Sequence, residues 1–121
     1  MINTSIQLLT TLHQELSALN GYLIVAPKIA TYPLMTYTIL NSQLGRVKSF
    51  TGQTNSFNVQ FSYFSDNSLA SCMSLAASAE TRLDSLSAFF DMDDGNINII
   101  GNSEQHNYYQ LNDTRVIELP Q

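Results

Sequence analysis

The sequence predicts an α+β fold in one domain, residues 1–121, with two helices packed on one face of a mainly antiparallel sheet. Two segments carry apolar residues at helical spacing, and several others alternate apolar and polar residues as strands do. Their succession along the chain gives the order α-β-β-β-α-β-β. Five glycines and three prolines are too few for a disordered or linker-dominated chain, so we expect one folded unit.

The first helix is predicted between the N-terminus and the Asn-Gly pair at residues 20 and 21. Apolar residues recur there at helical spacing, at Ile6, Leu9, Leu12, Leu16 and Leu19. Asn3, Thr4 or Ser5 can cap the start of this helix, and Asn-Gly supplies a left-handed stop. We expect the apolar stripe to face the core.

Two strands and a long connection are predicted next. The segment YLIVAPKIATYP suits a short strand broken at Pro27, because proline cannot donate to a sheet ladder. Residues 32 to 40, YPLMTYTIL, alternate in character and predict a strand that begins at Pro33. Residues 41–55 hold two glycines and many small polar residues, so we expect a long connection there.

The stretch FNVQFSYFSDNSLASCMSLAASAE, residues 57 to 80, changes from strand period to helix period. Its strand turns alternate residues, from Phe57 to Tyr63, to one face, and SDNS then offers side-chain oxygens that can cap a helix. One helical stripe follows, made of Leu69, Cys72, Met73, Ala76, Ala79, Leu83, Leu86 and Phe90. Because its alanines and cysteine permit close approach, this helix is expected to pack on the strand that precedes it.

Two or three strands are predicted after DMDDG, in NINII (96–100), HNYYQL (106–111) and TRVIEL (114–119). Half-polar strands indicate that one sheet face is covered and the other is less hydrophobic. Phe64 points opposite to Phe61, and Tyr108 points opposite to Tyr109. Large aromatic side chains are therefore expected on both sides of the sheet, which is typical of a sheet that meets a partner.

Composition excludes some classes of function. Charged residues make up only 12% of the chain, and a net charge of −5 with five basic residues argues against a module that grips phosphate backbones. The longest apolar run, YLIVA at 22 to 26, is too short to span a bilayer, and the N-terminus lacks the basic start of a signal peptide. We therefore expect a soluble, unexported chain with no membrane partner.

A thiol-based catalytic set would combine Cys72 with His13 or His106 and an aspartate. Cys72 lies in the middle of the apolar stripe, away from a helix N-terminus that would lower its pKa, so packing is the expected role. His13 lies off the main stripe of the first helix and is expected to be solvated. We predict no catalytic residues.

The acidic segment DMDDGN resembles the start of a calcium loop. An EF-hand loop needs glycine sixth and a bidentate glutamate twelfth, whereas Gly95 is fifth and Asn102 twelfth here. A solvated turn with left-handed backbone angles is therefore expected. We predict no metal site and no cofactor.

The ordered segments TYPLMTYTIL and SFNVQFSYFSDNSLASCMSLAASAETRLDSL, with a glycine-containing loop between them and a terminal strand pair, resemble the tail-terminator, or tail-completion, proteins of long-tailed bacteriophages. Those families typically combine a proline-led strand, here YPLMTY, with a strand that runs into an alanine-rich helix. The likeness spans most of the chain. It is carried by the order of these segments, with no invariant chemical motif.

The resemblance implies a structural virion protein, not an enzyme. Such a chain forms a hexameric ring at the head-proximal end of the tail tube, ends tube polymerisation and joins the tail to the head connector. The implied partners are other copies of the chain, the tail tube protein, the head connector or neck protein, and genomic DNA that passes without specific binding. The implied location is the tail or neck of the virion, and the host cytoplasm during assembly.

The resemblance also implies a protein-interface loop between the two central strands, with Arg46, Val47, Lys48 and Phe50 as its contact residues. From the residues alone, GRVKSF suits a solvated loop as well as a docking loop, because two charges are weak evidence for a patch. A ring whose copies each carry −5 is expected to let DNA slide through rather than stick.

Three alternatives remain open. Other head-tail neck components and minor tail proteins share similar short α+β plans. An acidic secretion-chaperone-like dimer, which holds an unfolded effector segment against exposed sheet surface, fits the size and the sequence pI of about 4.6. A small-molecule-binding or enzymatic domain comes third and would require a deep pocket that brings Cys72 and a histidine together.

Overall fold

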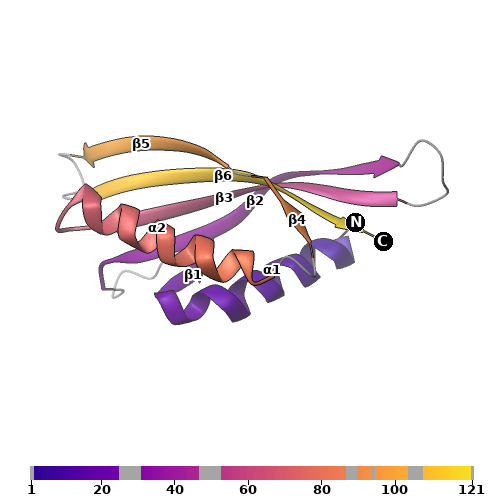
Figure 1. Cartoon of the computed structure of the whole chain (residues 1–121), viewed down its shortest axis with the longest axis horizontal. Coiled ribbons are helices and arrows are strands. Elements are labelled where there is room, and N and C mark those ends of the chain that lie inside the picture. Colours follow the sequence, from indigo (N-terminus) through magenta and orange to yellow (C-terminus); the bar gives the residue numbers. More distant parts are fainter. Residues whose placement is uncertain are drawn as a thin grey trace.

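The structure is a computed structural model that describes residues 2–24, 31–46, 53–86, 90–93, 95–103 and 108–120. Two helices lie against one face of a six-stranded sheet, and the α+β class is confirmed (Figure 1). The elements follow the order α1 (Ile2–Leu16), a 3-10 turn (Ser17–Leu19), β1 (Gly21–Leu23), β2 (Leu34–Arg46), β3 (Gln53–Ser65), α2 (Leu69–Asp84), β4 (Asp91–Met92), β5 (Asn96–Ser103) and β6 (Tyr108–Pro120).

The sheet has the strand order β1-β2-β3-β6, and β4 and β5 both pair with the far side of β6. β1 runs parallel to β2, and every other pairing is antiparallel. In Figure 1, β5 lies along the upper edge of the sheet, while β1 lies at the opposite edge beside α1. We call the side with the helices the covered face and the other side the open face.

The core lies between the covered face and the helices. Phe57, Val59, Phe61 and Tyr63 on β3 are fully buried and share that face, as their alternation predicts. Directly opposite them on β6 lie buried side chains from Leu111 to Ile117. Each buried apolar side chain of this set contributes about 1.5–3 kcal/mol when it leaves water, so the covered face supplies most of the driving force for folding.

Helix α1 is confirmed, but its buried row differs from the predicted stripe. Leu8, Leu12 and Leu16 are buried, whereas Ile6 is 58% exposed. The helix carries apolar residues on two neighbouring rows, and packing against the sheet selects the row spaced by four. The cap prediction was wrong, because α1 already begins at Ile2. Asn20 makes the left-handed stop, with φ of 61°.

The predicted connection over residues 41–55 was wrong. β2 continues to Arg46 and β3 already begins at Gln53, with paired registers from Leu34–Phe64 to Arg46–Gln53 and one irregularity between Ile39 and Asn41. Small polar residues are poor strand formers alone, but each strand here satisfies the other's backbone groups. The outer half of this hairpin, residues 41–46 and 53–56, projects past the helices in Figure 1 and is called the arm.

Helix α2 begins and ends where side-chain chemistry dictates. Ser68 caps it, because its hydroxyl oxygen accepts a hydrogen bond from the backbone N–H of Ser71 at 3.2 Å. Cys72, Ala79 and Leu83 are buried against the sheet, as the stripe predicts. Three positions differ from the expectation: Met73 is 54% exposed, and Leu86 and Phe90 are buried beyond the end of the helix.

The two predicted C-terminal strands are one strand, β6. Asn112 and Asp113 have the composition of a turn, but the Asp113 carboxylate is buried against Arg115, so the strand runs straight through them. The DMDDG segment also differs from expectation, because Asp91 and Met92 form β4, a short strand paired with β6. Tertiary pairing decides both outcomes.

Candidate assembly surfaces

One of the four predicted contact residues, Arg46, falls on the arm. Arg46 is the last residue of β2 and pairs with Gln53, while Val47, Lys48 and Phe50 lie outside the described residues. The structure therefore places Arg46 at the end of a projecting hairpin, where the sequence indicated only a long loop.

The open face of the sheet is polar and largely uncharged. Most of its residues on the central strands are partly buried and have amide or hydroxyl side chains: Thr36, Thr38, Ser56, Asn58, Gln60, Ser62, Gln110, Asn112 and Thr114. Leu34 and Val116 are apolar members of the same face. Neighbouring amides bond to one another, as Gln110 Nε2 donates to Asn112 Oδ1 at 2.9 Å. Asp91 and Glu118, which lie opposite each other, place charge only near one end of this face.

An aromatic group occupies the other end of the open face. Tyr108 stacks on Tyr32 with ring centroids 6.3 Å apart, and it meets Phe64 edge-on at 5.3 Å. Tyr109, the next residue, packs against the core on the covered side. The prediction that large aromatic side chains lie on both sides of the sheet is confirmed. Exposed and half-buried tyrosines of this kind are enriched in protein interfaces.

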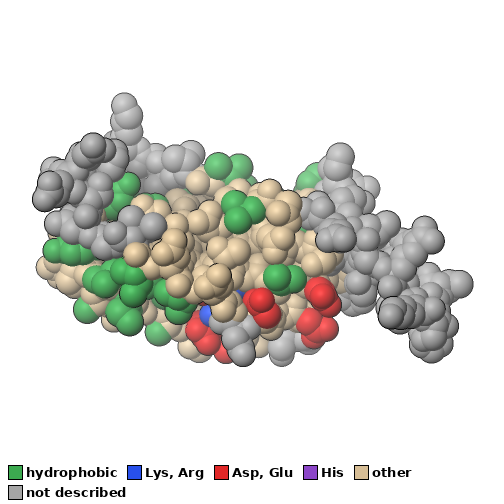
Figure 2. All heavy atoms as spheres, turned by 90° about the horizontal axis from the view of Figure 1, so that it is seen from above, with side chains coloured by type: hydrophobic (Ala, Val, Ile, Leu, Met, Phe, Trp, Pro, Cys, Tyr) green, Lys and Arg blue, Asp and Glu red, His purple; other side chains and the backbone are tan. Residues whose placement is uncertain are grey.

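Apolar side chains are also exposed at both edges of the sheet. Ile97 and Ile99 on β5 are 59% and 52% exposed, although their partners Asp113 and Leu111 face the helices. At the opposite edge, Ile6 and Leu23 border a hollow beside α1. Figure 2, which looks onto the β5 edge, shows separate hydrophobic groups on that surface, with acidic side chains beside them. α2 is too narrow to cover the whole sheet, so these positions stay in contact with water.

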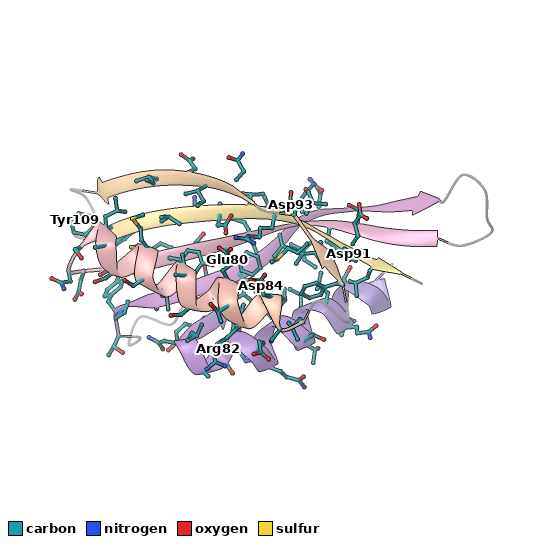
Figure 3. The ribbon with its side chains drawn as sticks, in the orientation of Figure 1. Glu80, Arg82, Asp84, Asp91, Asp93 and Tyr109 are labelled. Atoms are coloured by element: carbon teal, nitrogen blue, oxygen red, sulfur yellow. The ribbon has the colours of Figure 1, made fainter. Side chains whose placement is uncertain are left out.

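A charged cluster joins β6, α2 and the end of β4, and its Arg115 and Asp113 side chains are buried. The Arg115 guanidinium donates to Asp113 Oδ2 at 2.9 Å, to Glu80 Oε2 at 3.1 Å and to the Asp93 carbonyl at 3.4 Å. Figure 3 labels Glu80 on α2 and Asp93 just beyond β4. Burial alone would lower the pKa of Arg115, but the hydrogen bonds and negative charges of Asp113 and Glu80 together outweigh burial and raise that pKa. The cluster fastens three elements together.

The acidic turn is part of this cluster. Asp93 Oδ1 accepts hydrogen bonds from the backbone N–H groups of Gly95 and Val116, at 3.2 Å and 3.0 Å. Gly95 has φ of +87°, as expected for a left-handed turn residue, and a β-carbon there would collide with Asp113 Oδ1. The turn is thus fixed to the sheet rather than simply solvated. Among the described residues, no three His, Cys, Asp or Glu side chains are grouped to hold a metal ion.

Cys72 and His13 have separate roles. The Cys72 thiol is fully buried and donates to the Tyr109 carbonyl at 3.4 Å, and burial raises its pKa. A raised pKa disfavours the thiolate that nucleophilic chemistry requires. His13 is exposed, as predicted, but its Nδ1 bonds to the hydroxyl of buried Tyr37. His106 lies outside the described residues.

These features define a small α+β scaffold with a projecting arm, an open sheet face and exposed apolar edges. Its fold is similar to that of a chain in the virion of the native gene transfer agent (GTA) particle, with a TM-score of 0.58 over 91% of this chain and 92% of that chain. The two sequences are 12% identical, so the likeness shows a shared fold. No family model and no curated protein matches the sequence. Neither described helix has the length and apolar character needed to cross a membrane.

Proposed function

We propose that this chain is a structural component of a phage-like virion and acts as a tail terminator. In this role, copies of the chain form a ring at the head-proximal end of the tail tube. The ring ends polymerisation of the tube and joins the tube to the head connector. The observation that carries the proposal is the likeness to a chain of the GTA virion over nearly the full length of both chains. The resemblance of the central segments to tail-terminator proteins points the same way.

The surfaces support an assembly role. The arm offers contact with a tube subunit or a neighbour through its projecting end, where Arg46 lies. A standard interface needs about 800 Å² from each partner, and a projecting hairpin adds area without enlarging the core. The open face has amide and hydroxyl side chains over its central strands, which do not attract phosphate groups strongly. This chemistry suits DNA that passes without specific binding.

Tube assembly in the presence and absence of the chain tests the proposal. Electron micrographs should show tubes of uniform length with a ring at one end when the chain is present, and uncontrolled lengths when it is absent. A variant with Arg46→Ala, Lys48→Ala and Phe50→Ala should lose length control. Its matched control, Arg82→Ala, removes an exposed cation from α2 and should keep it.

Uncontrolled tube lengths in both samples would contradict termination. A stable dimer in light scattering, together with capture of an unfolded effector segment, would favour the secretion-chaperone alternative. Ring assembly without any effect on tube length would favour another neck or minor tail component.

A further inference from the structure

The two free edges of the sheet carry exposed apolar side chains on the same side. Within the described residues β5 pairs only with β6, and β1 pairs only with β2, so each has an outer edge without a partner strand. Ile97 and Ile99 on β5 lie opposite covered-face residues of β6. Leu23 on β1 lies beside Tyr37, which is also on the covered face. Both apolar edges therefore border the helix layer.

The two edges differ in shape. Ile97 and Ile99 lie on an exposed edge strand. Met73 is exposed on the same side of α2 as Glu80, which forms an ion pair with Arg115 of β6. The opposite edge has a hollow of about 490 Å³, here called the α1 hollow, lined by Ile6, Leu9, Thr10, His13, Gln14 and Leu23. Sites of roughly 300–1,000 Å³ accept molecules larger than one side chain, so it has room for both isoleucines.

Strand direction makes the two edges compatible. β1, β2 and β6 run one way, whereas β3 and β5 run the other way. If a second copy continues the sheet in the same orientation, β5 of one copy lies antiparallel to β1 of the next. Antiparallel edge pairing supplies backbone hydrogen bonds, and it keeps the covered faces of both copies on the same side.

Charge also favours a second copy as the occupant. The chain carries a net charge of −5, so two copies repel each other unless the meeting surfaces lack acids. β5, residues 96–103, and β1, residues 21–23, contain no charged residue. Within α1 the only acid is Glu15, which faces Arg82 of α2 at 3.8 Å. The edge strands themselves thus bring no charge into the contact, and the exposed acids of the β5 side, Glu80 and Asp93, lie beside it.

We infer that β5 of one copy adds antiparallel to β1 of the next and places Ile97 and Ile99 in its α1 hollow. The contact joins two different surfaces, so it repeats head to tail and closes into a ring when the rotation between copies allows. The inference rests on the proposed ring and names the surfaces that build it. It also explains why α1 carries a second apolar row: Ile6 and Leu9 line a surface that the neighbouring copy covers.

Charge substitutions at the two edges test the contact. Ile97→Asp and Ile99→Asp should each weaken self-association at least about tenfold in sedimentation or light scattering, because each places a carboxylate in an apolar contact. Ile6→Asp, on the other side of the contact, should have the same effect. The matched controls are Asn98→Asp, on β5 but directed to the open face, and Gln7→Asp, on α1 but outside the lining of the hollow. Both controls should assemble like the unmodified chain, and equal unfolding midpoints would show that all variants are folded.

Disulfide trapping tests which surfaces meet. Leu23→Cys mixed with Ile97→Cys or Ile99→Cys should give, under mild oxidation, a linked species of twice the 13.5 kDa chain mass. Neither variant alone should give it, and Cys72 is buried and should not react. Linkage of the Ile97→Cys variant to itself would overturn the inference, because it would mean that two β5 edges meet.

The outcomes separate this inference from the proposed function. Rings that persist in the Ile97→Asp, Ile99→Asp and Ile6→Asp variants, or rings that give no mixed disulfide, would overturn the contact and leave tail termination standing. Self-association that survives Ile6→Asp would mean that the α1 hollow receives a small apolar ligand or another protein instead of a second copy. That result would also overturn the contact. A chain that stays monomeric in solution and on tubes, and leaves tube length uncontrolled, would overturn both.

Discussion

On its covered face β3 presents Phe57, Val59 and Phe61, whereas on its open face the same strand presents Asn58 and Gln60 between them. The first set is fully buried beneath the helices, and the second is partly buried with no helix above it. Successive residues of a strand point to opposite faces of the sheet, so a single strand contributes side chains to two different surfaces. The difference indicates that the covered face provides most of the stability, while the side chains of the open face can vary to suit a binding partner.

The largest expected effect comes from removing a ring on the covered face. Phe61→Ala should lower the free energy of unfolding by about 3–5 kcal/mol, because it deletes a fully buried side chain in the middle of the core. Phe64→Ala, three residues away on the open face, should cost clearly less, since Phe64 is only half-buried. Urea unfolding of the two variants measures the difference. Equal losses would show that the two faces contribute alike and would break the comparison.

The next effect concerns the charged cluster around Arg115. Arg115→Ala should cost about 3 kcal/mol, because it leaves the buried carboxylate of Asp113 without its cation. Arg82→Ala, which removes a half-exposed partner of Glu15, should cost no more than about 1 kcal/mol.

A double variant sharpens this result. Asp113→Val combined with Arg115→Met should lose less stability than Arg115→Ala alone, since it removes both charges together. Chemical denaturation of the three variants gives the comparison. A double variant at least as unstable as Arg115→Ala would mean that the cluster stabilises by its specific bonds rather than by neutralising a buried charge.

Alkaline pH should act through the covered face. Burial raises the pKa of Tyr37 from 10 to about 12, and burial followed by the charge of Asp113 raises that of Tyr63. Between pH 10 and 12 the unfolded chain has released these protons while the folded chain keeps them, so the free energy of unfolding falls as pH rises. Below pH 10 the contribution is constant. Unfolding curves at several pH values should show the fall, and Tyr37→Phe should make it shallower.

The smallest effect is expected on the open face. Thr38→Val keeps the shape of a half-buried residue and removes only its hydroxyl, so stability should change by no more than about 0.5 kcal/mol. Thermal unfolding of this variant beside Ile39→Thr, which replaces an ethyl group with a hydroxyl on the covered side, provides the test. A larger loss from Thr38→Val would show that the hydroxyls and amides of the open face form a stabilising network.

Local sequence accounts for a good part of this fold. Period-two alternation correctly assigns Phe57 to Tyr63 to one face, and the SDNS segment correctly supplies the cap of α2 through Ser68. These features depend on neighbours within a few residues. The arm could not be read in the same way, because residues 41–46 and 53–56 become strands only by pairing with each other and, in part, with β6.

The candidate surfaces were predicted only in part. The sequence directed attention to Arg46, and the structure places it at the end of β2, but the other three predicted contact residues lie outside the described residues. The isoleucines of β5 and the α1 hollow were missed. A signal was present, since α1 holds more apolar residues than one buried row can use and NINII alternates isoleucine with asparagine.

By itself the sequence determined the α+β class, the order of the main elements and the apolar side of β3, because helix and strand periods are local properties of the chain. Only the tertiary structure decided which row of α1 is buried, that β6 runs unbroken through Asn112 and Asp113, and which apolar side chains stay exposed at the sheet edges. The physical reason is that a buried ion pair, a shared ladder of backbone hydrogen bonds and a free edge all depend on residues far apart in sequence.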